Sequence, residues 1–214
     1  MKIIITGALG HIGSRLIRDI PQFLCRYQFV LIDSLITERY SSLFQLPEDI
    51  NYTFLHSDIF EIDYSDILKD TVAVIHLAAI TDAERSVDRE KEVNRINFNG
   101  TEIIARACAK NSVPFIMIST TSVYGSQKDK VDETCEKLYP QSPYASSKLN
   151  AELLLKQLSV ETGLKFVILR FGTIFGKSIG MRFHTAVNKF CWQATLKQPI
   201  SVWETAYDQY RPYL

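Results

Sequence analysis

A tyrosine and a lysine four positions apart, Tyr144 and Lys148, carry the clearest catalytic chemistry in this sequence. They open a predicted helix, and residues four apart share one helix face. A phenol with a pKa of about 10 is a poor base at neutral pH. An ammonium one turn away favours the phenolate and brings that pKa towards the working range. The same spacing also occurs in ordinary helix-surface pairs, so the interpretation depends on the surrounding elements.

A hydroxyl-rich segment stands before this pair, at the end of a predicted strand. Residues 119–122 read Ser-Thr-Thr-Ser and follow the apolar run PFIMI. A hydroxyl donor at a strand end could hold the oxygen of a substrate. Tyr144, Lys148 and this segment together therefore indicate proton transfer to or from a substrate hydroxyl.

The first thirteen residues contain a glycine-rich turn that would bind the cofactor. The apolar run at 3–5 predicts a strand buried on both faces of a parallel sheet, and apolar spacing at helical period resumes at Ile12. Gly7, Gly10 and Gly13 lie between the strand and the helix. Glycine permits a tight turn and a close backbone approach, and the free amides of the first helical turn suit a pyrophosphate. This arrangement predicts a dinucleotide site.

Two acidic residues follow the next two predicted strands. Asp33 ends the strand FVLID, where a carboxylate can bind the adenosine ribose and disfavours the extra phosphate of NADP. The predicted cofactor is therefore NAD. Asp58 and Ile59 come at the end of NYTFLHSDI. Asp58 could accept a hydrogen bond from the adenine amino group, or it could cap the segment that follows.

Strands and helices alternate along the rest of the chain without repeats, which predicts an α/β fold with a doubly wound parallel sheet. We expect a loop with one short helix at 34–50, strands at 72–80, 114–120 and 165–172, helices at about 88–110 and 143–162, a helical stretch at 183–196 and a strand-like ISVW. Asn97, Asn99 and Gly100 interrupt the first long helix. Poor helix formers in a helix interior indicate a packing or functional requirement.

The composition excludes several classes of protein. The 24 basic and 24 acidic side chains of the 214 residues cancel, so neither nucleic acid nor an anionic membrane is an expected partner. No apolar run approaches the roughly 20 residues of a membrane span. The first strand begins so early that we expect no signal peptide and a cytoplasmic protein. The four cysteines and four histidines are scattered, so we expect reduced thiols and no metal site.

The complete set of motifs resembles an extended short-chain dehydrogenase/reductase of the NAD-dependent nucleotide-sugar epimerase and dehydratase group, like UDP-glucose 4-epimerases. In chain order, the motifs are TGALGHIG, the aspartate of LIDSL, Asp58-Ile59, HLAA, the N-x-N-G-T of 97–101, STTSVYG, SPYASSK and LRFGTIFG. The resemblance implies a Rossmann-type fold, NAD as cofactor, a nucleotide-sugar substrate and a homodimer formed through the two long helices.

The resemblance also implies a role for each matching residue. Tyr144 matches the general acid/base, Lys148 the lysine that binds the nicotinamide ribose, Thr120 the residue that holds the reacting hydroxyl, and Asn97 the asparagine that supports the lysine. The expected cofactor contacts are Gly7, Gly10, His11, Ile12, Gly13, Asp33, Asp58, Ile59, Leu77, Ala78, Ala79, Asn97, Tyr144 and Lys148. The expected substrate contacts are Thr81, Thr120, Thr121, Thr173 and Arg211.

Departures from the family pattern narrow the expected reaction. Members that dehydrate or decarboxylate the sugar usually carry acidic residues just after the catalytic Thr, where this chain has Thr121 and Ser122. Thr173 stands where an Asn commonly touches the substrate diphosphate. Epimerisation is therefore the leading prediction. A related dehydrogenase or reductase that releases its product, and a dinucleotide-binding protein without turnover, remain alternatives.

The resemblance also predicts two unequal domains. We expect an NAD-binding Rossmann domain at 1–171 and an incomplete start of a substrate-binding domain at 172–214. Members usually continue for about a hundred residues more, so this chain resembles a truncated member. We expect it to bind NAD and to turn over sugar nucleotides slowly or not at all.

Overall fold

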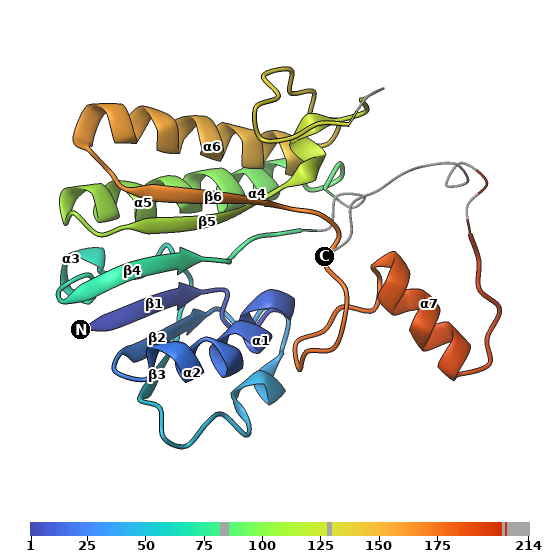
Figure 1. Ribbon diagram of the computed structural model, residues 1–214, viewed down its shortest axis with the longest axis horizontal. Helices are drawn as coiled ribbons and strands as arrows, with labels where there is room; N and C mark the ends of the chain where they lie inside the picture. Colours follow the sequence, from blue (N-terminus) through green and yellow to red (C-terminus); the bar gives the residue numbers. More distant parts are fainter. Residues whose placement is uncertain (82–85, 128–129, 203, 205–214) are drawn as a thin grey trace.

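In the computed structural model, six strands form one parallel sheet in the order β3-β2-β1-β4-β5-β6 (Figure 1). The structure describes residues 1–81, 86–127, 130–202 and 204. The strands are β1 (Lys2–Thr6), β2 (Gln28–Asp33), β3 (Tyr52–His56), β4 (Thr71–His76), β5 (Phe115–Thr120) and β6 (Phe166–Phe171). The order reverses between β1 and β4, which is where ligands bind in such sheets. The predicted doubly wound fold is confirmed.

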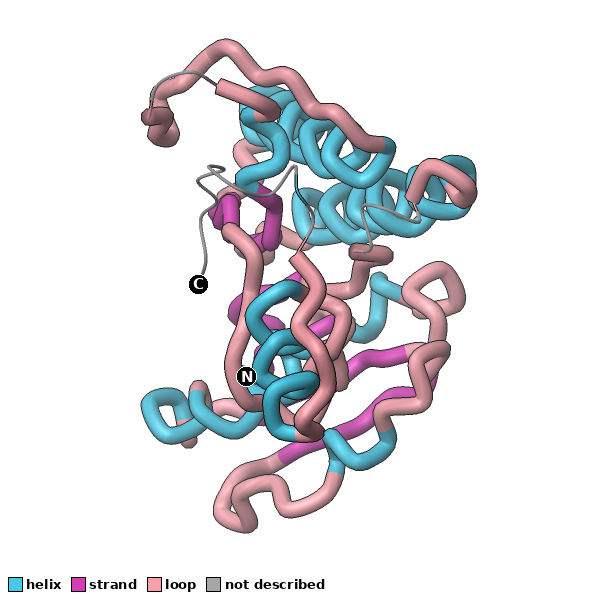
Figure 2. Tube along the Cα trace, turned by 90° about the vertical axis from the view of Figure 1, so that its right-hand side faces the viewer, coloured by secondary structure: helices cyan, strands magenta, loops and turns pink. Residues whose placement is uncertain are grey.

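Helices lie on both sides of the sheet (Figures 1 and 2). They are α1 (His11–Asp19), α2 (Pro21–Leu24), α3 (Tyr64–Ile67), α4 (Glu90–Asn94), α5 (Gly100–Lys110), α6 (Pro143–Thr162) and α7 (Ala186–Thr195). Short 3-10 turns form η1 (Tyr40–Leu43) and η3 (Thr121–Tyr124), and a π-helical segment, η2 (Arg95–Asn99), joins α4 to α5.

Alternating residues of the strands build two separate cores. Ile4 and Val74 point to one face of the sheet, where they pack with Ile104 of α5 and Leu155 of α6. Ile3 and its alternating neighbours point to the other face and pack with α1. This alternation follows from the two-residue period of a strand. It explains why the strands read as continuous apolar runs.

The second long helix forms as predicted, from Pro143 to Thr162. The Ser142 hydroxyl accepts a hydrogen bond from the Ala145 amide at 3.1 Å, and Gly163 ends the helix with φ of 74°. Serine at the N-cap, proline in the first turn and a left-handed glycine at the end are the local signals of such boundaries.

The first long helix, predicted at about 88–110, is continuous but changes its winding in the middle. The π-helical turn covers 95–99, where the sequence places Asn97 and Asn99. π-turns are frequent at functional sites. Here the wider turn accompanies Asn97, which is fully buried and hydrogen-bonds away from its own helix.

Two sequence expectations about element ends are wrong. β4 ends at His76 instead of Ile80. The Ile80 amide donates to Asn97 Oδ1 at 2.8 Å, and Asn97 Nδ2 donates to the Ile80 carbonyl at 2.9 Å, so Ile80 hydrogen-bonds a side chain instead of a neighbouring strand. The helical stretch predicted at 183–196 begins only at Ala186. In the strand-like ISVW segment, residues 200–202 form no strand, and residue 203 lies outside the described part of the chain.

The ring of His76 is completely buried between β1 and α5. It contacts the hydroxyls of Thr6 at 2.7 Å and Thr101 at 3.1 Å. Thr101 donates its only hydroxyl proton to the Asn97 carbonyl at 2.6 Å. The Nε2 of His76 must therefore donate to Thr101, which leaves Nδ1 to accept from Thr6. Burial lowers the pKa of His76 to about 3, so the ring is neutral.

We expect this histidine to make the fold sensitive to acid. The unfolded chain binds a proton on His76 below about pH 6.5, whereas the folded chain resists this down to about pH 3. The contribution of His76 to the free energy of unfolding is therefore fully present above about pH 6.5. Between about pH 6.5 and pH 3 it falls by up to about 1.4 kcal/mol per pH unit. Urea unfolding of the wild type and of His76→Asn at pH 7, 6 and 5 checks this. The variant should be less stable at pH 7 but lose less stability on acidification; equal slopes would contradict the prediction.

Candidate active site

The turn between β1 and α1 packs too closely for a side chain at Gly7 or Gly13. Gly7 has φ of 65°, and a Cβ there would lie 2.5 Å from the amide nitrogen of Ala78. A Cβ on Gly13 would lie 2.5 Å from the carbonyl oxygen of Ala8. The close packing places the first turn of α1 directly behind the loop, with its unpaired amides at the edge of the sheet.

Two adjoining cavities lie along this carboxyl edge, of about 380 and 290 Å³. We name them the Tyr144 cavity and the Asp33 cavity after residues in their walls. Seven residues line both cavities, namely Gly7, Gly10, Leu77, Ala79, Thr81, Arg182 and His184. The two cavities are therefore halves of one cleft, divided at the glycine-rich turn.

The Asp33 cavity contains the acidic residues predicted to contact adenosine. The Asp33 carboxylate accepts hydrogen bonds from the amides of Leu9 at 3.0 Å and Leu35 at 2.9 Å, which hold it at the end of β2. Asp58 also lines this cavity, and its carboxylate accepts from the Phe60 amide at 3.1 Å. Asp58 can therefore cap the turn that follows it and also line the cavity. Ile59 and Ala78 complete the predicted residues of this half.

The Tyr144 cavity brings together the three predicted catalytic side chains. Thr120 comes from the end of β5, and Tyr144 and Lys148 come from the first two turns of α6. The other predicted residues that line this cavity are His11, Ile12, Gly13, Thr81, Thr121 and Thr173. Arg211 lies outside the described residues. The parallel sheet creates this convergence, because the carboxyl ends of its strands meet at one edge.

Electrostatics distinguish the two members of the tyrosine-lysine pair. Burial raises the pKa of Tyr144, and the charge of Arg182 and a hydrogen bond with Thr120 oppose that rise. Within the protein alone, burial therefore outweighs these favourable contacts, whereas the predicted lowering of the tyrosine pKa also included the positive charge of a nicotinamide. Burial also lowers the pKa of Lys148 to about 8, against the opposing charge of Glu152. Lys148 is 3% exposed, and its side-chain ammonium makes no hydrogen bond to the described residues.

Asn97 lies behind the cleft and lines neither cavity. Besides Ile80, its side-chain amide donates to the Ser147 hydroxyl at 3.2 Å, and that hydroxyl donates to the Tyr144 carbonyl at 2.8 Å. Asn97 thereby links the segment after β4 to the turn of α6 that carries Tyr144 and Lys148. This geometry favours a positioning role for Asn97 over direct contact with a cofactor.

The sequence pattern of the NAD dependent epimerase/dehydratase family matches residues 3–214. The chain belongs to this family. A curated relative, the uncharacterized UDP-glucose epimerase YtcB of Bacillus subtilis, is 30% identical over 205 residues, which are 92% of this chain and 64% of the relative. The human dTDP-D-glucose 4,6-dehydratase is 29% identical over 82% of this chain and 51% of its own length. The chain therefore spans half to two thirds of these curated relatives.

Solved structures of family members have the same fold. A UDP-glucuronic acid 4-epimerase from Bacillus cereus, in complex with UDP-glucuronic acid and NAD, has a TM-score of 0.88 and 30% identity, over all of this chain and 68% of that chain. A UDP-N-acetylglucosamine 4-epimerase from Methanobrevibacter ruminantium also has a TM-score of 0.88, with 28% identity over the same shares. Both the predicted family and the NAD dependence are thereby confirmed.

The cleft fits the cofactor of this NAD-dependent family. Gly7 and Gly13 pack closely on backbone atoms and, with Gly10, line the Tyr144 cavity, where the amides of α1 suit a pyrophosphate. In the Tyr144 cavity, the buried ammonium of Lys148 has donors that the protein leaves unused, as ribose hydroxyls would require. We propose that Asp33 and Asp58 hold the adenosine half and that Lys148 holds the nicotinamide ribose. NAD would contribute hydride transfer there.

Asp33 should make this family member prefer NAD to NADP. Replacing Asp33 by Asn keeps its shape and one hydrogen-bond acceptor but removes the charge that repels a ribose phosphate. We expect the ratio of NAD to NADP affinity to fall by about tenfold or more, which calorimetric titration with each cofactor would measure. Asp19→Asn, on the exposed side of α1, is the matched control. Tighter binding of NADP than of NAD by the wild type would overturn the prediction.

Sequence reasoning missed Arg182 and His184, which line both halves of the cleft. They belong to the segment between β6 and α7, whose path crosses the glycine-rich turn. Gly176 accepts from the His11 ring at 3.2 Å through its carbonyl, and the Gly180 amide donates to the Ser14 hydroxyl at 2.9 Å. The spacing of apolar residues between β6 and α7 does not predict that this segment packs against the glycine-rich turn.

Within the described residues, none of the helices has the length and apolar character needed to cross a membrane.

Proposed function

We propose that this chain forms the cofactor-binding and catalytic part of an NAD-dependent epimerase of a nucleotide-diphosphate sugar. The observation that carries the proposal is the convergence of Thr120, Tyr144 and Lys148 in a cavity that joins the dinucleotide cleft at Gly7 and Gly10. We further propose residues 1–171 as the NAD-binding domain and 172–214 as the first part of a substrate-binding domain. Thr173 and Arg182 of this second part already line the Tyr144 cavity.

Each of the three side chains has a distinct task in this proposal. Bound NAD would supply a hydride acceptor and, once reduced, a hydride donor. Tyr144 takes the proton of a sugar hydroxyl while the hydrogen on the same carbon leaves as hydride, which produces a ketone. Thr120 holds the reacting oxygen by a hydrogen bond. Tyr144 would return the proton to the same oxygen when the cofactor reduces that carbon again from its other face.

The charges near Tyr144 support its work as a base. Burial raises the pKa of the phenol, so a phenolate needs cations close by. Arg182 opposes the effect of burial on this pKa, and Lys148 adds a second positive charge on the same helix face. Lys148, with a pKa of about 8, carries its charge through most of the neutral range.

The walls of the Tyr144 cavity favour epimerisation over dehydration. The described residues that line it include neither Asp nor Glu. After Thr120, two hydroxyl residues, Thr121 and Ser122, occupy the positions where dehydrating members usually carry acids. Elimination of water needs an additional acid and base, for which carboxylates are the usual groups. Simple proton and hydride exchange at one carbon needs only Tyr144 and the cofactor.

The test is a parallel assay of UDP- and dTDP-linked hexoses with NAD. Proton NMR follows the sugar, and absorbance at 340 nm follows reduction of the cofactor. Interconversion of two sugars without net absorbance change supports the epimerase. Net reduction with release of an oxidised sugar supports the related dehydrogenase instead. NAD binding without either reaction supports a dinucleotide-binding role.

We also propose that α5 and α6 pair with a second copy of the chain. Leu153 and Val160 of α6 are 54% and 89% exposed, and Ile103 of α5 is 42% exposed. Exposed apolar side chains on adjacent helices are typical of interfaces. Two other apolar residues of these helices, Ile104 and Leu158, are buried in the core and do not contribute to this surface.

A further inference from the structure

Glu152 is a buried carboxylate that the proposed reaction does not use directly. It is 1% exposed and lies one helical turn after Lys148 and two turns after Tyr144 on α6. Residues at this spacing share one helix face, about 5–6 Å apart from turn to turn. A charged carboxylate is costly to bury unless it is paired and hydrogen-bonded. Its position therefore requires partners from other elements.

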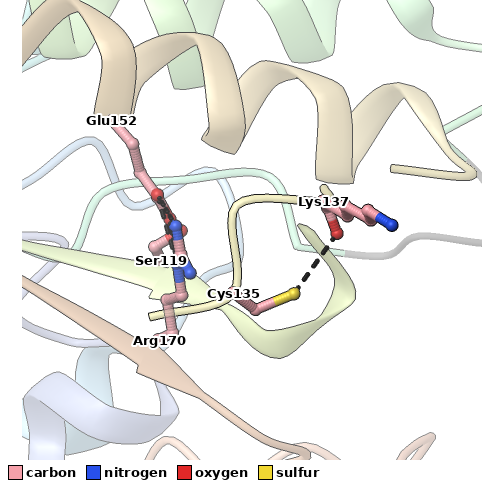
Figure 3. Close-up of polar contacts among 5 residues, drawn as sticks. All are labelled: Ser119, Cys135, Lys137, Glu152 and Arg170. Carbon is pink, nitrogen blue, oxygen red and sulfur yellow. Dashed lines mark hydrogen bonds and ion pairs between the residues drawn. The ribbon is translucent and has the colours of Figure 1, made fainter. Parts of the chain in front are cut away.

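Two strands supply those partners (Figure 3). From β5, the Ser119 hydroxyl donates a hydrogen bond to Glu152 at 2.5 Å. From β6, Arg170 donates to the same carboxylate through Nε at 3.0 Å and Nη2 at 2.6 Å. The Arg170 guanidinium also stacks on the Tyr124 ring, 4.8 Å from its centre. Bidentate geometry and extra hydrogen bonds are what allow an ion pair to be buried.

This cluster differs from the other ion pairs of the described residues, which lie on the surface. The side chains of Glu152 and Arg170 are 1% and 12% exposed, whereas those of Glu102 and Arg106 on α5 are 32% and 53% exposed. Surface pairs contribute little to stability, while breaking a buried pair leaves an uncompensated charge. The buried pair therefore specifies one arrangement of α6 against β5 and β6.

That arrangement is the one the catalytic residues need. Ser119 precedes Thr120 in β5, so the bond from Ser119 to Glu152 fixes the strand end that carries Thr120 against the helix that carries Tyr144. The charge of Glu152 raises the pKa of Lys148 one turn earlier on α6, and Arg170 partly offsets that charge. The Lys148 ammonium acts in turn on the neutral His76 of β4. The other titratable side chains that line the cavity of Lys148 are Tyr144, His11, Arg182 and His184.

We propose that Glu152 is a positioning residue that holds the Thr120 end of β5 against α6 and supplies the negative charge opposite the Lys148 ammonium. Its importance for catalysis rests on the proposed function, but its effect on Lys148 does not. Burial lowers the pKa of Lys148, and the Glu152 charge raises it, to a balance of about 8. Loss of the carboxylate should leave the desolvated ammonium less stable.

The decisive measurement is the pKa of Lys148 in Glu152→Gln, by NMR of the chain labelled with ¹³C at lysine Cε. The resonance that disappears in Lys148→Arg identifies the residue. The pKa should fall from about 8 in the wild type to about 7 or lower in the variant. Mere loosening of the structure predicts the opposite, because entering water would raise the pKa towards 10.5. An unchanged or raised pKa in Glu152→Gln overturns the proposal.

A control and a second variant complete the test. Glu102→Gln removes an exposed carboxylate from the neighbouring helix and should leave the Lys148 titration unchanged. If Glu152→Gln does not fold, the double variant Glu152→Gln/Arg170→Gln removes the guanidinium together with its carboxylate partner and should fold. The Lys148 pKa should fall there too, because the charge of Glu152 acts on this pKa whereas that of Arg170 is not among its causes. No fall in that variant also overturns the proposal.

Turnover adds a separate readout. If the chain interconverts sugars, the alkaline limb of the kcat/KM profile should move to lower pH in Glu152→Gln, with the Lys148 pKa. A lowered Lys148 pKa without any sugar turnover would support the role of Glu152 while rejecting the proposed function.

Discussion

Replacing Tyr144 by Phe is expected to lower sugar interconversion at least about 100-fold while NAD affinity changes little. The phenyl ring keeps its place in the cavity, and only the group that carries the proton is lost. Thr120 and Lys148 remain, so substrate oxygen and cofactor ribose keep their partners. Proton transfer by a positioned side chain typically contributes 100-fold to 10,000-fold to rate.

Two measurements on the same protein separate the chemical effect from a binding effect. Turnover, or single-turnover reduction of NAD where turnover is slow, reports the chemistry, and calorimetric titration reports NAD affinity. Tyr52→Phe is the matched control, because it removes a phenol that donates to the Ile17 carbonyl at 2.6 Å, away from both cavities. Tyr144 is not the acid/base if its variant keeps more than about a tenth of the rate.

Replacing Gly7 by Ala should weaken NAD binding strongly and destabilise the fold. The new Cβ would lie 2.5 Å from the amide nitrogen of Ala78 and 2.7 Å from the carbonyl carbon of Leu77. These are backbone atoms, so the clash can be relieved only by moving the turn or the segment after β4. A strained φ and overpacking together should lower the free energy of unfolding by about 2–4 kcal/mol. The displaced turn should weaken NAD binding more than about tenfold.

Gly163→Ala isolates the contribution of the backbone angle. Gly163 also has positive φ, 74°, but a Cβ there meets nothing within 4 Å. This variant should lose only about 1 kcal/mol and keep its NAD affinity. Urea unfolding and NAD titration of the two variants provide the comparison. Equal losses in both would show that close packing at Gly7 is not what the cofactor turn requires.

The sequence by itself determined the elements whose signals are local. Continuous apolar runs marked the buried strands, because both faces of a parallel sheet are covered. The helix at about 143–162 was predicted from local signals, since Ser142 and Gly163 each act on backbone groups a few positions away. The glycine-rich turn and the candidate catalytic residues Thr120, Tyr144 and Lys148 were predicted from motif spacing. Their convergence at one sheet edge follows from the predicted parallel topology.

The tertiary structure alone decided features that depend on contacts between distant residues. β4 ends at His76 because Asn97, from the following helix, satisfies the backbone of Ile80 in place of a neighbouring strand. Arg182 enters the cleft because its loop crosses the glycine-rich turn, a path that no periodicity encodes.

The surroundings of Tyr144 and Lys148 show most clearly what the sequence determines and what the tertiary structure decides. Sequence spacing placed a cation near Tyr144, but whether the phenol pKa rises or falls depends on how much protein covers it, and burial raised it. In the sequence, nothing distinguishes Glu152 from other charged helix residues. In the structure, β5 and β6 enclose its carboxylate, which Ser119 and Arg170 hydrogen-bond. Residue types and spacing identify the groups that can react, whereas desolvation and partners from distant strands set their charges, because both arise only when the chain has packed.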